Sequence, residues 1–549
     1  MPTAFSTTIL PDPELASCLA ATESFPNTSA PQAKLGQLFL QRKAYRAAGE
    51  AFRRALALGA DDGWIHAGMA DVASASGALL SAARSYEAAS QRFHGNQPWL
   101  FLAANAYWEL GWTDAALARF ANLPRPLPDW WAGVYQNAKA AMTTHRATAL
   151  RCLAMLRSGT IDAGAAGALL MSLLPAGRLR AAQGLAIRLA ATFPEDLAIA
   201  EARARIAFRI EGPQAGLALL AQHPGVVTRS QAAAELGAIM AIEAGDLNLA
   251  AACLDKTLHA KWTGKLWAMA CRVRIAAGDL AGLTALAEEW IAASKGSDSA
   301  PYQFMLEGLR QAGGLPLLRE EAAEAASPPA SPGPGLGLLQ FWNTPTPPPD
   351  VAAVIATWAE MNPDLPRSLL DEAGARAFIK EAHGATAAHC FDLCHHAAMK
   401  SDYLRLLWLF THGGLYADID DRCIRPVAPV LAALQDSEVV VVLARLSPPY
   451  FNNCLIAARP RSALLGLAIK EATERILWGA KAGQKLSIWN DTGPGLLTRT
   501  MVRALMRTKT PAAARAVATV IPDYMLTRFT RNDPALVYKM TQEGNWRLA

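Results

Sequence analysis

Residues 400–427, KSDYLRLLWLFTHGGLYADIDDRCIRPV, decide the fold of the C-terminal half of this chain. The segment begins with the spacing of an amphipathic helix, breaks at Gly413 and Gly414, and continues as a short hydrophobic strand. That strand ends in three acids, Asp418, Asp420 and Asp421. Because open α/β sheets bind ligands beyond the carboxyl ends of their strands, the sequence predicts a functional site at this tip.

The acids at this tip suit a metal ion. Asp418 and Asp420 are two residues apart, so an extended backbone would point both carboxylates to the same face. A hard divalent cation takes such oxygen ligands and is often completed by the phosphates of a substrate. Asp421 would point to the opposite face, and we expect it to support the site from behind or to lie at the surface.

Composition excludes several classes of protein. The chain has 549 residues, of which 52% are hydrophobic and 18% charged, so it is long and apolar enough for more than one folded domain. The net charge of +5 is spread along the chain without a dense basic run, which argues against a nucleic-acid partner. The eight cysteines are scattered, which indicates a reduced, cytoplasmic compartment.

The sequence predicts neither a secretory signal nor a membrane span. Residues 1–30 contain no basic segment followed by an apolar core. No apolar run approaches the ~20 residues that cross a bilayer. Peripheral association with the inner face of a membrane stays open.

The N-terminal half contains an internal repeat. Two series of residues recur every 34 positions: the small residues Ala48, Ala82 and Ala116, and the aromatic residues Phe52, Tyr86 and Phe120. Gly77 and Gly111 stand five residues before the second and third alanine. The pattern resembles the tetratricopeptide repeat (TPR), a helix-turn-helix unit with glycine at the turn and a small residue where two helices approach.

The repeat pattern predicts an all-α solenoid over residues 31–315, after a loose N-terminus over residues 1–30. We expect roughly eight helical pairs between about Ala33 and Gly313, with one degenerate repeat around residues 141–158. By analogy, such arrays dock a protein partner or a second copy on their concave face. The alternative is that the array only supports the second domain. Four tryptophans are expected to serve packing: Trp64, Trp99, Trp108 and Trp112.

A Pro/Gly/Ser-rich linker over residues 316–336, including ASPPASPGPGLG at 326–337, separates the array from a second domain over 337–549. Strands are expected at 336–342, 438–444 and 453–458, in addition to the strand that ends in the acids. Helices are expected at 350–360, 373–383, 389–410 and 463–478. Strands that alternate with helices indicate an α/β sheet covered by helices.

The second domain resembles glycosyltransferase family 32, the sugar transferases with a DXD motif. The resemblance is carried by Leu339-Gln340-Phe341-Trp342, by Ser401-Asp402-x-x-Arg405 and above all by Gly413-Gly414-x-Tyr416-x-Asp418-x-Asp420. It implies a GT-A (Rossmann-like) fold, a bound Mn²⁺ or Mg²⁺, a UDP- or GDP-linked sugar donor and retention of the anomeric configuration. The acceptor would be a glycan, a lipid-linked glycan or a protein.

The resemblance also implies roles for single residues. Asp420 and Asp418 would hold the metal, with Asp418 nearer the sugar and ribose. Asp402 and Arg405 lie on one face of a helix and would contact the donor sugar, although this spacing also suits an internal ion pair. The remaining expected donor contacts are Trp342 against the base, Tyr416 as support, Asn453, and Trp546 as a closing residue.

Weaker assignments complete the predicted site. Asn452 and Asp491 are candidates for the acceptor side, and Lys539, next to Tyr538, is a candidate phosphate-neutralising cation. The cluster HCFDLCHH at 389–396 would suit zinc, but it has no second ligand pair at a usual spacing. Two other functions stay open: an inactive TPR scaffold and a metal-dependent nucleotide-sugar hydrolase.

Overall fold

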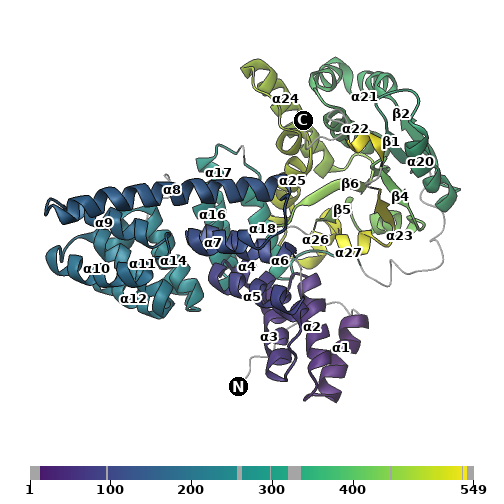
Figure 1. Ribbon diagram of the computed structural model, residues 1–549. Helices are drawn as coiled ribbons and strands as arrows, with labels where there is room; N and C mark the ends of the chain where they lie inside the picture. Colours follow the sequence, from purple (N-terminus) through teal and green to yellow (C-terminus); the bar gives the residue numbers. More distant parts are fainter. Residues whose placement is uncertain are drawn as a thin grey trace. The chain divides into compact units, whose positions relative to one another are not determined.

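The computed structural model describes residues 13–93, 97–255, 262–296, 298–318, 336–444, 448–533 and 536–540 (Figure 1). The chain forms two compact units, one of residues 11–286 and one that contains the residues from Ala287 onwards. The first is built from helices, and the second contains a six-stranded sheet with helices packed on it. This confirms the predicted class, a helical repeat region followed by an α/β domain.

The first unit starts with helical hairpins. They are α2 (Ser29–Gln41) with α3 (Tyr45–Ala57), α4 (Gly63–Ser76) with α5 (Leu79–Arg92), and α6 (Gln97–Glu109) with α7 (Thr113–Ala121). The 34-residue series lies at their contacts, since Ala48 and Ala116 are 0% exposed and Ala82 is 1% exposed. Small side chains at these positions let neighbouring helices approach closely. Gly77 ends α4 with a φ of 81°, a conformation that glycine adopts at little cost.

The middle of the helical unit differs from the prediction. Residues 129–157 form one helix of 29 residues, α8 (Asp129–Arg157), in place of a degenerate repeat around residues 141–158. No glycine or proline interrupts residues 134–157, so the chain has no turn signal until Gly159, whose φ is 72°. The unit continues with α9 (Ala163–Leu173), α10 (Leu179–Thr192), α11 (Leu197–Glu211), α12 (Pro213–Gln222), α13 (Gly225–Arg229), α14 (Gln231–Glu243), α15 (Leu247–Asp255) and α16 (Gly264–Ala277).

The N-terminal segment is more ordered than its composition indicates. Residues 13–24, within the segment expected to be loose, form helix α1 (Pro13–Ser24). Leu15 and Cys18 are buried in a cluster with Leu35 and Leu38 of α2, which gives this helix an apolar contact. Trp99 and Trp112 are buried as expected, whereas Trp64 is 54% exposed and touches Trp99 only edge-on.

The compact unit that contains the sheet begins earlier than the predicted boundary at 315/316. Helix α17 (Leu280–Ala293) reaches into it, and α18 (Ala300–Gln311) lies within it. Tyr302, Leu306 and Leu315 belong to the same buried cluster as the sheet. Leu318 N donates to Val520 O at 2.8 Å, so the chain after α18 runs along the sheet edge. Most of the predicted linker, residues 319–335, lies outside the described residues.

The six-stranded sheet has the order β2-β1-β3-β6-β5-β7. Its strands are β1 (Leu338–Phe341), β2 (Arg367–Leu370), β3 (Gly414–Ala417), β5 (Val439–Leu443), β6 (Phe451–Ala458) and β7 (Ala518–Pro522). Strand β1 pairs in parallel with β2 and β3, and β6 runs antiparallel to β3 and β5. A second, two-stranded sheet joins β4 (Asp421–Cys423) to β8 (Thr530–Asn532).

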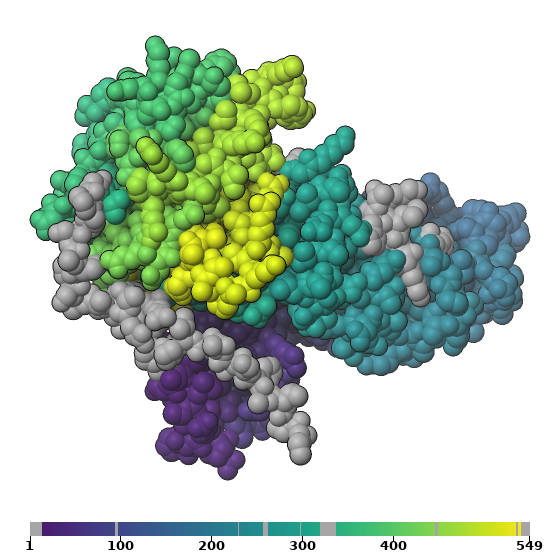
Figure 2. Space-filling model, turned by 180° about the vertical axis from the view of Figure 1, so that it is seen from behind, coloured from purple at the N-terminus to yellow at the C-terminus, as the bar shows by residue number. Residues whose placement is uncertain are grey.

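Helices cover both faces of the large sheet (Figure 1). One face packs on α21 (Glu372–Leu393), α22 (Ala397–His412), α24 (Ala463–Ala482) and α25 (Pro494–Met506). The other packs on α20 (Pro349–Met361), α23 (Ala428–Ala432) and α27 (Asp523–Leu526). Figure 2 shows the last described elements, in yellow, on the surface of the green part of the same unit. The described part of the chain contains no helix with the length and apolarity needed to cross a membrane.

The helices before the acid-tipped strand are divided differently from the prediction. The expected helices at 373–383 and 389–410 appear as α21, which bends at Gly384 (φ 84°), and α22. The break falls at His396, whose Nδ1 accepts a hydrogen bond from Ala398 N and so caps α22. Because α22 begins at Ala397, Asp402 lies in its second turn.

Candidate active site

The predicted acids lie on a turn between two sheets. β3 ends at Ala417, residues 419 and 420 form a turn, and β4 starts at Asp421. Asp418 N donates to Cys454 O at 2.8 Å, and Asp421 N donates to Asp418 O at 3.2 Å. The extended backbone assumed from sequence is therefore wrong at this point, because the chain bends between Asp418 and Asp420. The turn itself holds the two carboxylates on one segment.

Glycine at position 414 makes this geometry possible. Its φ is 96°, and a Cβ there would lie 2.2 Å from Gly337 O. A side chain would therefore push β3 away from the residues that lead into β1. The glycine pair predicted to form a sharp turn thus also allows two strands to approach closely.

Asp418 contacts a buried cation and a phenol. Its Oδ1 accepts a hydrogen bond from Tyr416 OH at 2.8 Å and lies 3.2 Å from Arg405 Nη1. The pKa of Asp418 is raised to about 8, because burial and the nearby Asp420 and Asp421 raise it by more than Arg405 lowers it. The turn is thus a place where negative charge is crowded.

Asp402 and Arg405 form the predicted pair on one helix face. Arg405 Nη2 lies 3.0 Å from Asp402 Oδ1, and the side chains are 5% and 6% exposed. Arg405 also donates to Ser401 O at 3.2 Å and to Asn453 O, and its guanidinium lies 4.0 Å from the centre of the Tyr416 ring. Burial lowers the pKa of Arg405, but the surrounding Tyr416, Asp418 and Asp402 raise it by more, so it stays protonated.

Both oxygens of Asp402 are occupied. Oδ1 accepts a hydrogen bond from Asn453 Nδ2 at 2.8 Å, and Oδ2 accepts one from Thr492 Oγ1 at 3.1 Å. Asn453, predicted as a donor-side residue, is therefore adjacent to the predicted pair. Thr492 was not predicted as a site residue, although its position in the Thr492-Gly493-Pro494 motif was a usable signal.

Asp420 and Asp421 contact residues near the C-terminal end of the described chain. Lys539 Nζ lies 2.6 Å from Asp420 Oδ2, and Asn532 Nδ2 donates to Asp420 Oδ2 at 3.2 Å and to Asp421 Oδ1 at 2.9 Å. Asp421 is 5% exposed, which corrects the surface alternative predicted for it and leaves the supporting one. Burial and Asp420 raise its pKa to about 7, while Asn532 lowers it. Sequence reasoning did not identify Asn532, because nothing local links β8 to β4.

Trp342 lies close to this group through Tyr538. The two rings are 5.2 Å apart and nearly perpendicular. The Nε1 atom of Trp342 is buried and has no hydrogen-bond partner among the described residues. Burial, together with the charge of Asp420 and a hydrogen bond to it, raises the pKa of Tyr538 well above its usual range. The residues expected at the donor side thus gather around the acid turn.

Three predicted residues are not in this group. Asn452 Oδ1 accepts a hydrogen bond from Cys454 N at 3.1 Å, within its own strand. Asp491 accepts one from Ser487 N at 2.7 Å and lies 3.4 Å from Arg475, so it is engaged in the loop before α25. Trp546 lies outside the described residues.

The carboxylates fit a divalent cation. Asp420 already has an ammonium group at its carboxylate, and Asp418 Oδ2 accepts no hydrogen bond from any residue that the structure describes. Within the described residues, no three His, Cys, Asp or Glu side chains are arranged to bind a metal. Two protein carboxylates are nevertheless enough when phosphate and water complete the shell. At the alternative zinc cluster of residues 389–396, Cys394 Sγ donates to Cys390 O at 3.3 Å, and both thiols are buried.

Comparison with known proteins assigns part of this domain. Residues 348–438 match the profile of the family "Glycosyltransferase sugar-binding region containing DXD motif". The match includes the acid turn together with Asp402 and Arg405, and leaves out Trp342 and Asn453. No curated protein matches the chain. The chain therefore carries a DXD-containing glycosyltransferase region, as the motifs predicted.

Solved structures match each half at low similarity. The PaToxG glycosyltransferase is 18% identical, with a TM-score of 0.25, and the match covers 30% of this chain and 68% of that one. A tetratricopeptide repeat protein from Parabacteroides merdae is 16% identical, with a TM-score of 0.22 and coverage of 45% and 98%. Cut9–Hcn1 of the APC/C is 11% identical, with a TM-score of 0.25 and coverage of 54% and 69%. With TM-scores this low, nothing further follows from these likenesses.

Proposed function

We propose that this protein is a metal-dependent glycosyltransferase of the GT-A type, which moves a sugar from a UDP- or GDP-linked donor to a glycan, a lipid-linked glycan or a protein. One observation carries the proposal. The matched region contains the Asp418–Asp420 turn, and Arg405 joins that turn to Asp402 through ion pairs of 3.2 and 3.0 Å. A charged network of this kind, placed at a strand end, suits a ligand that carries both phosphate and hydroxyl groups.

Asp420 and Asp418 are the residues that would hold Mn²⁺ or Mg²⁺. Such a cation, when bound, neutralises the charge that develops on a diphosphate leaving group. Lys539 is the second cation of the site and would turn from Asp420 toward a phosphate. Trp342 would pack against the base, and Trp546 would cover the diphosphate and exclude water.

Asp402 is proposed to orient the sugar rather than to attack it. Both of its oxygens accept hydrogen bonds, Arg405 neutralises its charge, and the residue is 5% exposed, which makes it a poor nucleophile for a covalent intermediate. Retention would then follow from attack by the acceptor hydroxyl on the face that the diphosphate leaves. The acceptor oxygen bonds to the anomeric carbon, the bond to the diphosphate breaks, and the proton passes to the departing phosphate.

A thermal-shift screen tests the proposal. The full-length protein is heated with UDP, GDP and ADP, each with and without Mn²⁺. We expect one nucleotide to raise the melting temperature only when the metal is present, and Asp420→Ala to abolish the shift. Asp392→Ala is the matched control, because Asp392 is an acid of α21 that forms an exposed pair with Arg376 and has no assigned role in the site. Failure of every nucleotide to bind in a metal-dependent way would reject the proposed function.

Two rival functions predict other results. An inactive scaffold would bind no nucleotide. A nucleotide-sugar hydrolase would bind the nucleotide and release the sugar to water at the same rate whether or not acceptors are present. We favour transfer because the acids, Asp402 and Arg405 are all present and connected. A cytoplasmic location, with access to the inner face of a membrane, is part of this proposal.

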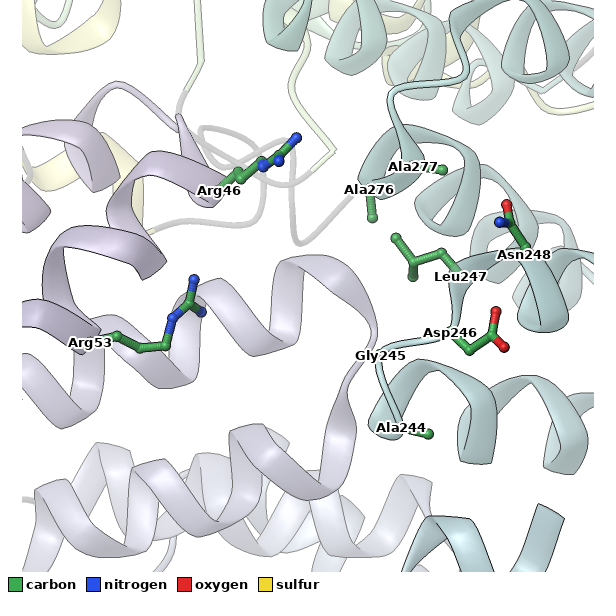
Figure 3. Close-up of a pocket in the computed structure, with 9 residues that line it drawn as sticks. All are labelled: Arg46, Arg53, Ala244, Gly245, Asp246, Leu247, Asn248, Ala276 and Ala277. Atoms are coloured by element: carbon green, nitrogen blue, oxygen red, sulfur yellow. The ribbon is translucent and has the colours of Figure 1, made fainter. Parts of the chain in front are cut away.

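The helical unit is proposed to dock an acidic segment of a protein acceptor or partner. A cavity of about 800 Å³ lies between α3, the turn that follows α14 and the end of α16 (Figure 3). Arg46 and Arg53 line one side, two helical turns apart, opposite small apolar residues and Asp246. Two guanidinium groups at this spacing suit two carboxylates of one peptide.

The double variant Arg46→Glu/Arg53→Glu should weaken binding of an acidic peptide about tenfold or more and leave nucleotide binding unchanged. Equal peptide binding by the variant would contradict the docking proposal. That result would leave the transferase proposal standing.

A further inference from the structure

A short π-helical turn lies against Asp402. This turn, η3 (Ile488–Thr492), directly precedes α25, and its last residue supplies the hydroxyl that donates to Asp402 Oδ2 at 3.1 Å. Gly493 follows it, and a Cβ at that position would lie 2.5 Å from Ile488 O and 3.1 Å from Asp402 Oδ2. Only glycine therefore lets the turn come this close, and the position of η3 determines how Asp402 is held.

A buried arginine holds η3 from the side of α25. The side chain of Arg499 is 0% exposed, and its Nη2 donates to Asn490 O at 2.5 Å. Its Nε donates to Glu471 Oε1 of α24 at 2.8 Å. Arg475 and Arg503 also donate to Glu471, at 3.1 and 2.8 Å. A buried cation with this many partners tolerates little displacement, because each lost bond leaves a desolvated charge.

Gly296 and Ser299 hold η3 from the side of the last helices before the sheet. Trp489 Nε1 donates to Ser299 Oγ at 3.1 Å, and Ser299 is 4% exposed. Arg475 Nη2 donates to Gly296 O at 2.7 Å and thereby joins the Glu471 cluster to the same segment. Tyr450 packs edge-on against Trp489 with ring centres 4.7 Å apart. The repeat pattern had assigned this segment to the array.

We propose that Ser299, Trp489 and Arg499 are positioning residues of the transfer site, which hold η3 so that Thr492 keeps Asp402 in the orientation needed for the donor sugar. The proposal rests on the proposed function, because it gives these residues a role through Asp402. None of the three contacts the acid turn itself in the described structure. They therefore affect the rate of transfer and leave metal and nucleotide binding to Asp418 and Asp420.

The test uses full-length Ser299→Ala, Trp489→Phe and the double variant, with UDP- and GDP-linked sugars and Mn²⁺. Each single change should lower turnover about tenfold, because a small misplacement of an orienting group is costly. The dissociation constant of the nucleoside diphosphate should stay within about twofold, since the metal site is intact. The turnover of the double variant should be no lower than that of either single variant, since both changes remove the same hydrogen bond between Trp489 and Ser299.

Ser437→Ala is the matched control. Ser437 is 0% exposed, and its hydroxyl donates to Arg515 O at 2.7 Å. Within the described structure, this hydrogen bond does not involve η3 or Asp402. This variant should lose stability and keep its turnover. Wild-type turnover in the Ser299 and Trp489 variants would overturn the proposal. A parallel fall of turnover and nucleotide affinity, in proportion to the folded fraction, would overturn it as well.

Hydrogen exchange separates failure of this proposal from failure of the proposed function. Amides of residues 488–493 should exchange faster in Ser299→Ala and in Arg499→Met than in the wild type, without any ligand. Unchanged exchange would reject the positioning role. If residues 488–493 exchange faster in the variants but the protein binds no nucleotide, the proposed transferase function is rejected, and the role of these residues in transfer is rejected with it.

Discussion

At the scale of single residues, the site consists of charged side chains that are paired with one another. Arg405 is shared between Asp402 and Asp418, so one side chain keeps the donor-side acid and the acid turn in register. This pair could be predicted from its spacing on a helix, because residues three apart share a face. Asn532 could not, because its contact with Asp421 joins segments 111 residues apart in sequence.

Replacing Arg405 should destabilise the protein strongly. Arg405→Met removes the cation and leaves Asp402 buried without its partner, which costs about 3–5 kcal/mol. Urea unfolding followed by circular dichroism measures this loss. Arg376→Met is the control, since Arg376 makes an exposed pair with Asp392 whose loss should change the stability far less. Equal stability of the two variants would contradict the role given to Arg405.

Gly414 should tolerate no side chain. In Gly414→Ala the new Cβ would meet Gly337 O at 2.2 Å in a backbone with φ of 96°, so the strand must move. We expect a loss of more than about 2 kcal/mol from strain alone. Gly483→Ala provides the comparison, because its φ is 63° but nothing lies within 4 Å, and it should lose only about 1 kcal/mol. Similar losses in both variants would show that the close approach to Gly337 does not matter.

At the scale of elements, helices and strands with a continuous apolar pattern could be predicted from the sequence. Boundaries that depend on contacts between distant segments could not. Helix α20, helix α24 and strand β5 appear within a few residues of the expected ranges, because their apolar spacing is continuous. Strands β2, β7 and β8 were not expected, since each is short and two of them join elements distant in sequence. The division between α21 and α22 depends on a cap by His396, which no apolar period reveals.

The packing of α24 on α25 should make stability pH-dependent. Burial alone would raise the pKa of Glu471, but Arg499, Arg503 and Arg475 lower it below its ordinary 4.5 by a larger amount. A lowered pKa stabilises the folded state above pH 4.5, and this contribution is lost as the pH falls through the folded-state pKa.

Glu471→Gln should remove that dependence and cost about 3 kcal/mol at pH 7, because Arg499 stays buried without its partner. Unfolding free energies measured between pH 7 and pH 3 test both effects. A variant that loses stability on acidification as steeply as the wild type would contradict the assignment.

At the scale of the whole molecule, the repeat pattern located a helical half and the DXD motif located an α/β half. The 34-residue spacing held for the hairpins up to α7, where small residues lie at each contact, and failed at α8, where the turn signal is missing. The predicted repeat array also extended too far along the chain, because α18 has apolar residues that belong to the core of the sheet domain. Helical periodicity shows that a helix has a buried face but does not show which core buries it.

Ligand binding should protect one unit only. UDP or GDP with Mn²⁺ should slow hydrogen exchange in β3 and β4 and leave residues 13–93 unchanged, because the acid turn and its partners lie within the unit that begins at Ala287. Mass spectrometry of peptic fragments gives the comparison. Protection confined to the helical unit would contradict the placement of the nucleotide site.

The most direct measurement for the central claim is a calorimetric titration of the selected nucleotide into the full-length protein at several Mn²⁺ concentrations. We expect affinity to rise with the metal concentration, as coupled binding at one site requires. In Asp420→Asn the affinity should no longer depend on the metal, whereas Asp392→Asn, which changes an exposed acid outside the site, should behave as the wild type. Nucleotide affinity that is independent of Mn²⁺, or that is unchanged in Asp420→Asn, would contradict the assignment of Asp418 and Asp420 as the metal-binding centre of a glycosyltransferase.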